Sequence, residues 1–336
     1  MSRTHNGGAG IFVTFDPASP MTTGQGGHVL VIVAPGQGAQ TPGFLAPWIA
    51  DPALAAQLAR LSEVSGIDLA HYGTQADADT IRDTAIAQPL LVASALLSGR
   101  ALLGDDVARV GVLAGHSVGE LAAMALAGAV SDEDALVLVR ERGRAMAEAS
   151  AVQPTSMTAV IGGDRDEVLA AIEAAGLTPA NNNGSGQIVA AGTVAQLEEL
   201  AANAPKRARL FPLSVAGAFH TVHMEPAVAH LASVAEGVTP GEPVTALLSN
   251  RDGAVVDSGA DALRRMVNQV ANPVRWDLCM EAMAERGVTG LLELTPAGTL
   301  TGIAKRNLKG VELFNLNTPD QLDEARAFVQ THTESE

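Results

Sequence analysis

The sequence is poor in cysteine and in positive charge, and each shortage excludes a class of protein. Cys279 is the one cysteine among 336 residues, which excludes a disulfide framework and a zinc site built from cysteines. Lysine and arginine total 21 against 37 aspartate and glutamate residues, so the formal net charge is −16 at pH 7. Such an acidic chain has no general attraction for nucleic acid or for an anionic membrane, and a phosphate-bearing partner has to meet a local basic patch.

Long uninterrupted apolar runs are also missing. A bilayer crossing takes about 20 apolar residues, and the longest candidate, residues 86–103, is interrupted by a glutamine, a proline, two serines and an arginine. The first 27 residues contain one arginine but no continuous apolar segment of the kind that a secretory signal needs. We therefore expect a soluble, cytoplasmic protein with no membrane partner, in which residues 1–27 form a flexible leader and Met21 is an alternative start.

Two strand patterns, each followed by a glycine-containing turn and helical patterns, indicate an α/β fold. Residues 28–34 form a continuous apolar, β-branched run that ends at Pro35, and residues 109–114 form a second run. Unbroken runs of this kind are typical of parallel strands that are buried on both faces. Hydrophobic residues make up 47% of the chain, enough for a sizeable core, and the length allows two domains.

The remaining patterns divide the chain into a large α/β domain and a small inserted one. In the large domain, strands are expected at residues 28–34, 109–114, 244–249, 290–294 and 311–315, and helices at 53–64, 86–103, 131–149, 225–236, 261–270, 277–286 and 298–308. Short strands at 157–161, 187–191 and 207–212 with helices at 164–175 and 193–203 indicate a ferredoxin-like α+β subdomain. We assign residues 28–153 and 214–318 to the large domain, 154–213 to the small subdomain, and 319–336 to a C-terminal helix and tail.

The second strand is followed directly by Gly115-His-Ser-Val-Gly119, which is the G-x-S-x-G pattern between a buried strand and a helix. In this context the pattern predicts a nucleophile elbow, because glycines on both sides allow a sharp turn that exposes the Ser117 hydroxyl. The next backbone N–H, that of Val118, then points to where an oxyanion would form, at the positive end of a helix dipole. The large domain is therefore expected to be α/β-hydrolase-like; the alternative is an ordinary strand-to-helix turn with a capping serine.

A serine nucleophile needs a base, and the eight histidines supply the candidates. His116 is adjacent to Ser117 on a tight turn, where neighbouring side chains diverge, so we interpret it as a packing residue. His220 follows a strand-like run and a Gly-Ala loop, a position from which a side chain can reach a distant elbow. His223 and His230 fall on the following helix, where surface or core roles are more common.

Taken together, the motifs resemble those of a known enzyme family. The motifs that carry the resemblance, in chain order, are Pro35-Gly-Gln-Gly-Ala-Gln40, Gln88-Pro89, Gly115-His-Ser-Val-Gly-Glu120, Arg142-Gly143, Asn181 to Gln187, Gly217-Ala-Phe-His220, Asn272-Pro273-Val274 with Trp276, and Leu300 to Arg306. Their order and spacing are similar to those of the malonyl-CoA:acyl-carrier-protein transacylases of fatty-acid and polyketide synthesis. The resemblance extends from about residue 29 to residue 314, and it departs from the family at Thr295-Pro-Ala-Gly298, where relatives usually have Gly-Pro-Gly.

The resemblance implies a set of roles at the elbow. Ser117 would be the acylated nucleophile and His220 its base, and the backbone carbonyl of Gln269 would orient His220 in place of a triad aspartate. The backbone N–H of Gln37 would complete the oxyanion hole beside that of Val118. Without the resemblance, the loop that contains Gln37 would be interpreted as a glycine-rich turn or a phosphate cradle.

The resemblance also implies how the acyl group is chosen. Arg142 would hold the free malonyl carboxylate through parallel hydrogen bonds; from the sequence alone, pairing with charged neighbours on an exposed helix face is the more common role of such a residue. Phe219 would crowd a 2-methyl branch, which is worth about 1–3 kcal/mol of discrimination. His116 and Asn183 are assigned with Phe219 to the acyl pocket.

The expected reaction is a ping-pong transfer of malonyl from malonyl-CoA to the thiol of a holo acyl-carrier protein, with no metal or cofactor apart from the coenzyme A thioester. Both partners are acidic, so a basic docking patch is predicted. Its candidate residues are Lys206, Arg207, Arg209, Arg275, Lys305, Arg306 and Lys309. We expect a monomer. A serine esterase or thioesterase with the same Ser-His pair remains the alternative, and the sequence leaves the pathway, fatty-acid or polyketide, open.

Overall fold

One of the two five-stranded β-sheets is parallel throughout, as the unbroken apolar runs predict. The computed structural model describes residues 28–333; the predicted leader and the last three residues lie outside this range. The strands, in spatial order, are β10 (Glu312–Asn315), β9 (Gly290–Glu293), β1 (Leu30–Ala34), β2 (Val112–Gly115) and β7 (Ala246–Leu247). The carboxyl ends of β1 and β2 therefore lie side by side, so the loops that follow them meet at one edge.

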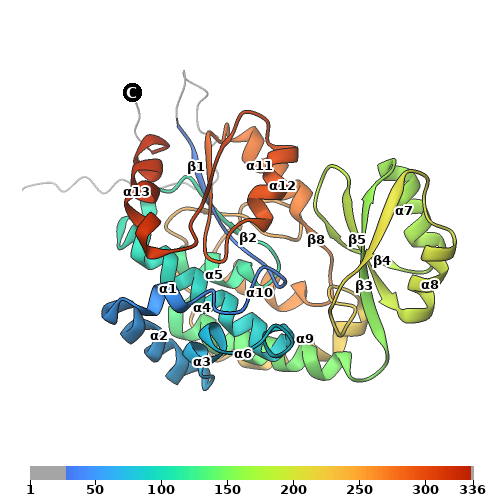
Figure 1. Cartoon of the computed structure of the whole chain (residues 1–336), viewed down its shortest axis with the longest axis horizontal. Helices are drawn as coiled ribbons and strands as arrows, with labels where there is room; N and C mark the ends of the chain where they lie inside the picture. Colours follow the sequence, from blue (N-terminus) through green and yellow to red (C-terminus); the bar gives the residue numbers. More distant parts are fainter. Residues whose placement is uncertain (1–27, 334–336) are drawn as a thin grey trace, which may run out of the picture.

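Helices cover both faces of this sheet (Figure 1). Leu30 and Ile32 of β1 face one hydrophobic core, whereas Val31 and Val33 face another. The helices of the first core include α2 (Pro52–Ser65), α4 (Thr84–Leu103), α5 (Gly119–Leu126), α6 (Asp132–Ser150), α9 (Glu225–Ala235) and α10 (Gly259–Gln269); those of the second are α11 (Trp276–Glu285) and α12 (Thr299–Asn307). Because successive residues of a strand point to opposite faces, a strand that serves two cores is apolar at every position.

Two short helices and the C-terminal helix complete this part of the chain. The short helices α1 (Ala46–Ile49) and α3 (Leu69–Thr74) lie near α2 and were not predicted from the sequence. At the C-terminus, α13 (Leu322–Thr331) contacts α4 and follows a turn of 3₁₀ helix. Helices of four to six residues have too few turns for a periodic pattern to register.

Helix α4 is the central helix of the first core. It begins at Thr84, capped by Asp83, so Pro89 lies in its second turn rather than in the first turn as the sequence suggested. Among the described residues, α4 is the one helix long and apolar enough to cross a membrane by length and composition. However, 83% of its apolar window is buried inside the protein, and its largest contact is with α6, which is how a core helix behaves.

The second sheet, that of the small subdomain, has the predicted ferredoxin-like topology. Its elements follow the order β3 (Thr155–Gly162), α7 (Arg165–Ala174), β4 (Thr178–Asn182), β5 (Gln187–Thr193), α8 (Val194–Ala202) and β6 (Ala208–Pro212), a β-α-β-β-α-β unit. Its spatial order is β6-β3-β5-β4-β8, where β8 (Val274–Arg275) comes from a later part of the chain. The sequence missed β4, whose Thr-Pro-Ala-Asn-Asn has no apolar alternation, and β8, which is two residues long.

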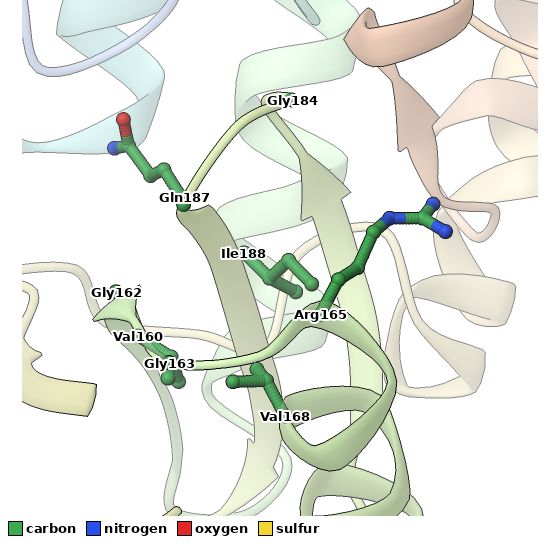
Figure 2. Close-up of a pocket in the computed structure, with 9 residues that line it drawn as sticks. Val160, Gly162, Gly163, Arg165, Val168, Gly184, Gln187 and Ile188 are labelled. Atoms are coloured by element: carbon green, nitrogen blue, oxygen red, sulfur yellow. The ribbon is translucent and has the colours of Figure 1, made fainter. Parts of the chain in front are cut away.

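Strand β8 and several side-chain contacts join the sheet of the small subdomain to the larger part of the molecule (Figure 1). Where β3 ends and β5 begins, the side chains of Arg165, the first residue of α7, and Gln187, the first residue of β5, extend to opposite sides around a small cavity lined by glycines and aliphatic residues (Figure 2). Arg165 donates to Asp277 of α11 at 3.3 Å, and Gln187 accepts from Arg306 of α12 at 3.0 Å. The α+β subdomain is thus held against α11 and α12.

Candidate active site

Ser117 lies on a strained turn between β2 and α5. Its φ angle is +53°, a left-handed conformation that is uncommon for a residue with a side chain. A Cβ at Gly115 would lie 2.0 Å from the backbone of Gly119, and a Cβ at Gly119 would lie 2.3 Å from the carbonyl oxygen of Ala34. Glycine is therefore required at both positions, as the elbow pattern predicts.

The side chain of Asn250 holds the backbone of the turn through two hydrogen bonds. Its Oδ1 accepts the Ser117 N–H at 2.7 Å, and its Nδ2 donates to the Gly115 carbonyl at 2.8 Å. The residue is fully buried and follows shortly after β7, the strand beside β2. Our sequence reasoning missed Asn250, although a polar residue just beyond a buried parallel strand, next to the strand of the elbow, was a signal that could have found it.

His220 reaches the serine, as predicted. Its Nε2 lies 2.7 Å from Ser117 Oγ, and its Nδ1 lies 2.8 Å from the backbone carbonyl of Gln269. A carbonyl can only accept, so Nδ1 carries the proton and Nε2 is left to accept the serine hydroxyl. Burial, and then the positive charge of Arg142, lower the pKa of His220 from 6.5 to about 3. The ring is therefore neutral at physiological pH, the state that a proton acceptor needs.

The other two candidate histidines, His223 in the 3₁₀ turn before α9 and His230 on α9, make their contacts away from the elbow. His223 is hydrogen-bonded to Gln153 at 2.6 Å, in an exposed position, and His230 contacts Glu141 at 2.9 Å. Both are surface residues, in agreement with the sequence interpretation.

Arg142 is completely buried beside the serine. Its Nη1 donates to Gln88 Oε1 at 2.6 Å, and its Nη2 donates to Gln269 Oε1 at 2.9 Å and contacts Ser117 Oγ at 3.3 Å. Its Nε has no partner among the described residues. Burial lowers the pKa of Arg142 from 12.5 to about 10, so the guanidinium is still charged at neutral pH.

The exposed-face alternative for Arg142 is wrong, because its neighbours make those contacts instead. Glu141 pairs with Arg140 at 2.7 Å and with Arg144 at 3.6 Å on the outer side of α6. A signal for the inward orientation was present in the sequence. Buried α6 residues recur at helical spacing, at positions 135, 138, 139, 146 and 149, and Arg142 falls within this apolar stripe.

The loop after β1 lies against the elbow. A Cβ at Gly36 would be 2.8 Å from the carbonyl oxygen of His116, so glycine permits this close approach. The Gln37 side chain donates to Thr84 at 3.2 Å and accepts from Gln88 at 3.5 Å. The structure therefore brings Gln37 and Val118, which follows the serine, to the same edge of the sheet, as expected for loops after neighbouring parallel strands.

The three predicted pocket residues lie around the same turn. Phe219, which precedes His220, is 6% exposed. His116 Nε2 is 2.8 Å from Asn183 Oδ1, and its ring meets the edge of the Trp276 ring at a centroid distance of 5.6 Å. Burial lowers the pKa of His116, which keeps this ring neutral as well. The ring therefore packs between the two sheets, which agrees with the packing interpretation.

The predicted docking cations come from three elements of the fold. Lys206, Arg207 and Arg209 lie on or next to β6, which is one edge of the subdomain sheet, whereas Arg275 lies on β8 at the opposite edge. Lys305, Arg306 and Lys309 lie on or just after α12. Arg275 pairs with Asp277 at 2.8 Å, so part of its charge is already neutralised. Within the described part of the chain, no group of three side chains is suited to hold a metal ion.

Comparison with known proteins agrees with this geometry. The chain matches the acyl transferase domain family over residues 31–330. It is 50% identical to the malonyl CoA-acyl carrier protein transacylase of Mycolicibacterium smegmatis, over 83% of this chain and 98% of that protein. The crystal structure of MCAT from Mycobacterium tuberculosis superposes with a TM-score of 0.86 at 48% identity, over 89% of this chain and 100% of that chain.

A further solved structure contains a malonyl-transacylase in complex with its type II polyketide synthase acyl-carrier protein. It matches with a TM-score of 0.83 at 32% identity, over 89% of this chain and 99% of that chain. The acyl transferase match covers most of the chain, and the relatives are matched over nearly their whole length. This chain therefore belongs to the malonyl CoA-acyl carrier protein transacylase family of acyl transferases.

Proposed function

We propose that this chain transfers the malonyl group of malonyl-CoA to the phosphopantetheine thiol of an acyl-carrier protein. The observation that carries the proposal is the buried guanidinium of Arg142, 3.3 Å from the hydroxyl oxygen of Ser117. A charged donor so close to a nucleophile suits an acyl group with a carboxylate at its far end. The relatives named malonyl CoA-acyl carrier protein transacylase support the same substrates.

In the first half-reaction, Ser117 Oγ attacks the thioester carbon of malonyl-CoA while His220 Nε2 takes the hydroxyl proton. The backbone N–H groups of Gln37 and Val118 hold the oxyanion, helped by the positive end of the α5 dipole. Collapse of the tetrahedral intermediate breaks the C–S bond, and His220 returns the proton to the departing sulfur. Coenzyme A leaves and a malonyl ester remains on Ser117.

In the second half-reaction, the carrier thiol attacks the malonyl ester. His220 takes the thiol proton, the C–O bond to Ser117 breaks, and the proton passes to Ser117 Oγ. The Gln269 carbonyl, 2.8 Å from His220 Nδ1, stabilises the charged imidazolium of each step as the carboxylate of a triad would. These steps use no metal or cofactor beyond the coenzyme A thioester.

The surrounding assignments complete the proposal. We assign residues 28–153 and 214–318 to the catalytic domain and residues 154–213 to the small subdomain, with the acyl pocket formed by Phe219, His116 and Asn183. The β6 and α12 cations receive the acidic carrier, and the chain works as a cytoplasmic monomer. The malonyl product supplies extender units for fatty-acid or polyketide synthesis.

The competing function is a serine esterase or thioesterase, which would use the same Ser-His pair. Intact-protein mass spectrometry after brief exposure to malonyl-, methylmalonyl- and acetyl-CoA separates the two, because a transferase retains its acyl group until the carrier arrives. We expect a malonyl adduct that is absent from Ser117→Ala and that passes to holo acyl-carrier protein. Release of malonate to water without an adduct, or equal labelling by acetyl-CoA, would favour the hydrolase or a broader acyltransferase.

A further inference from the structure

One buried carboxyl group beneath the elbow has no part in the reaction steps above. Glu120 lies in the first turn of α5 and is 2% exposed. Both of its oxygens accept hydrogen bonds: Oε1 from the backbone N–H of Asn250 at 3.4 Å, and Oε2 from the side-chain amide of Gln269. A carboxyl group that accepts at both oxygens is best satisfied in its ionised form.

Gln269 connects Glu120 to the reacting groups. Its Nε2, which donates to Glu120, also donates to the Ser117 carbonyl and to Asn250 Oδ1, both at 3.1 Å. Its Oε1 accepts from Arg142 Nη2 at 2.9 Å, and its backbone carbonyl accepts from His220. A side-chain amide can present either its oxygen or its nitrogen in a given direction, so its partners decide the orientation.

The charge on Glu120 reinforces one orientation of the amide, because Glu120 is the third acceptor of the Gln269 NH₂ group beside the Ser117 carbonyl and Asn250 Oδ1. Ionised Glu120 draws the Gln269 NH₂ group toward itself, which leaves the amide oxygen facing Arg142. If Glu120 is protonated, it becomes a donor, and an amide that turns its oxygen toward Glu120 turns its NH₂ group toward the guanidinium. Two donors then face each other, and Arg142 loses its acceptor next to Ser117.

We propose that ionised Glu120 is a positioning residue that, through the amide of Gln269, holds Arg142 in the orientation that receives the substrate carboxylate. The inference rests on the proposed malonyl transfer. Glu120 touches neither the substrate nor the serine oxygen; it acts through one intervening side chain.

Among the described titratable groups at this site, Glu120 is the one whose pKa lies near neutrality. Burial raises the pKa of Glu120 from 4.5 to about 7, against the opposing effects of its hydrogen bonds and of the Arg142 charge. The facing groups do not change charge in the same range. Arg142 on α6 has a pKa of about 10, Cys279 on α11 has a pKa raised well above 9.0, and His220 has a pKa of about 3.

The first test uses the unaltered protein. We measure the rate at which malonyl-CoA acylates Ser117, by rapid quench and intact-protein mass spectrometry. The attacking group in this half-reaction is the serine hydroxyl, so the titration of a carrier thiol does not enter the pH profile. We expect this rate to rise with pH through a single ionisation near 7 and then level off, because Glu120 ionises over this range while His220 is already neutral. A rate that is flat between pH 5.5 and 8.5 overturns the inference, whereas absence of any adduct overturns the proposed function instead.

The second test compares two replacements of Glu120, one that removes its charge and one that keeps it. Glu120→Gln keeps the shape but cannot ionise, so we expect malonylation to fall about 10- to 100-fold and the ionisation near pH 7 to disappear. Acetylation should fall much less, because acetyl has no carboxylate for Arg142 to hold. Glu120→Asp, which keeps the charge on a shorter stem, should restore part of the rate together with the pH dependence.

Cys279→Ser is the matched control. It alters the same buried region, where the hydrogen bonds of Cys279 Sγ are to Asn250 Nδ2 at 3.8 Å and to the Ser249 carbonyl at 3.4 Å. This variant should keep the pH dependence near 7. If Glu120→Gln retains the ionisation, or lowers malonylation and acetylation equally, the role of Glu120 is that of an ordinary core residue and the inference is wrong.

Discussion

Replacing Arg142 by glutamine tests the origin of acyl selectivity most directly. In the free protein, the guanidinium makes two short hydrogen bonds, to Gln88 at 2.6 Å and to Gln269 at 2.9 Å. Its Nε has no partner among the described residues, and its contact with Ser117 Oγ is long at 3.3 Å. Two donors are therefore available to a carboxylate, and Arg142→Gln removes them together with the charge.

The expected loss can be estimated from those two donors. A hydrogen bond to a charged group contributes about 1.5–3 kcal/mol, so two such bonds contribute about 3 kcal/mol at the lower end. This energy corresponds to about a 100-fold loss of kcat/KM for malonyl-CoA, since about 1.4 kcal/mol is a factor of ten. Acetyl-CoA has no carboxylate, so Arg142→Gln removes no hydrogen bond to its acyl group. Its kcat/KM should stay the same or rise, because the replacement also removes a buried charge that acetyl leaves unpaired.

The assay is the ratio of kcat/KM for malonyl-CoA to that for acetyl-CoA, measured for the unaltered protein, for Arg142→Gln and for Arg144→Gln. Arg144 lies two residues later on the same helix, with its side chain 54% exposed and paired with Glu141, so its replacement should leave the ratio unchanged. If Arg142→Gln lowers both substrates to the same extent, the guanidinium only stabilises the site and does not select the acyl group.

Three further predictions concern the pocket, the docking surface and stability. Phe219→Ser should raise kcat/KM for methylmalonyl-CoA about 10- to 100-fold relative to malonyl-CoA, measured in competition. Lys305→Glu with Arg306→Glu should raise the KM for the carrier at low salt but not the KM for malonyl-CoA; an unchanged carrier KM would exclude α12 from docking. Between pH 4.5 and 6.5, Glu120 is protonated in the folded chain but ionised in the unfolded chain, so its contribution to stability falls as the pH rises. His220 is neutral in the folded chain but protonated in the unfolded chain, so its contribution to stability rises with pH and offsets that of Glu120. In Glu120→Gln the His220 contribution remains alone, and the free energy of unfolding should rise with pH relative to the unaltered protein, by up to about 1.4 kcal/mol per pH unit in urea titrations.

The parts of the fold that were predictable are those encoded in short stretches of sequence. The elbow, the buried strands before it and after residue 28, and three strands and both helices of the small subdomain each follow from local periodicity and glycine spacing. Strand β4 was not predictable in this way, because its stability comes from hydrogen bonds to β5 and β8 on either side rather than from its own residues.

The residues of the candidate site likewise divide into those that the sequence predicts and those that it does not. The proximity of Ser117 and His220 could be expected, because the elbow pattern requires a base and few histidines were suitably placed. Asn250 was missed although its place just beyond β7 was a signal, and Glu120 could not be expected, because its role depends on a contact with Gln269, 149 positions away. No spacing rule connects such positions; the parallel topology brings them together beneath one turn.

The partners of Arg142 explain how a fully buried charge can remain available to a ligand. Both short contacts are to amide oxygens, of Gln88 and Gln269, and neither is to a carboxylate. A carboxylate in direct contact would neutralise the guanidinium and compete with the substrate, whereas no partner at all would make burial too costly. Amide oxygens satisfy the donors without cancelling the charge, and Glu120 stabilises that charge from one residue further away. The positive charge is thus tolerated in the free protein and still lacks an anion in contact, which is the condition under which a malonyl carboxylate binds more favourably than a methyl group.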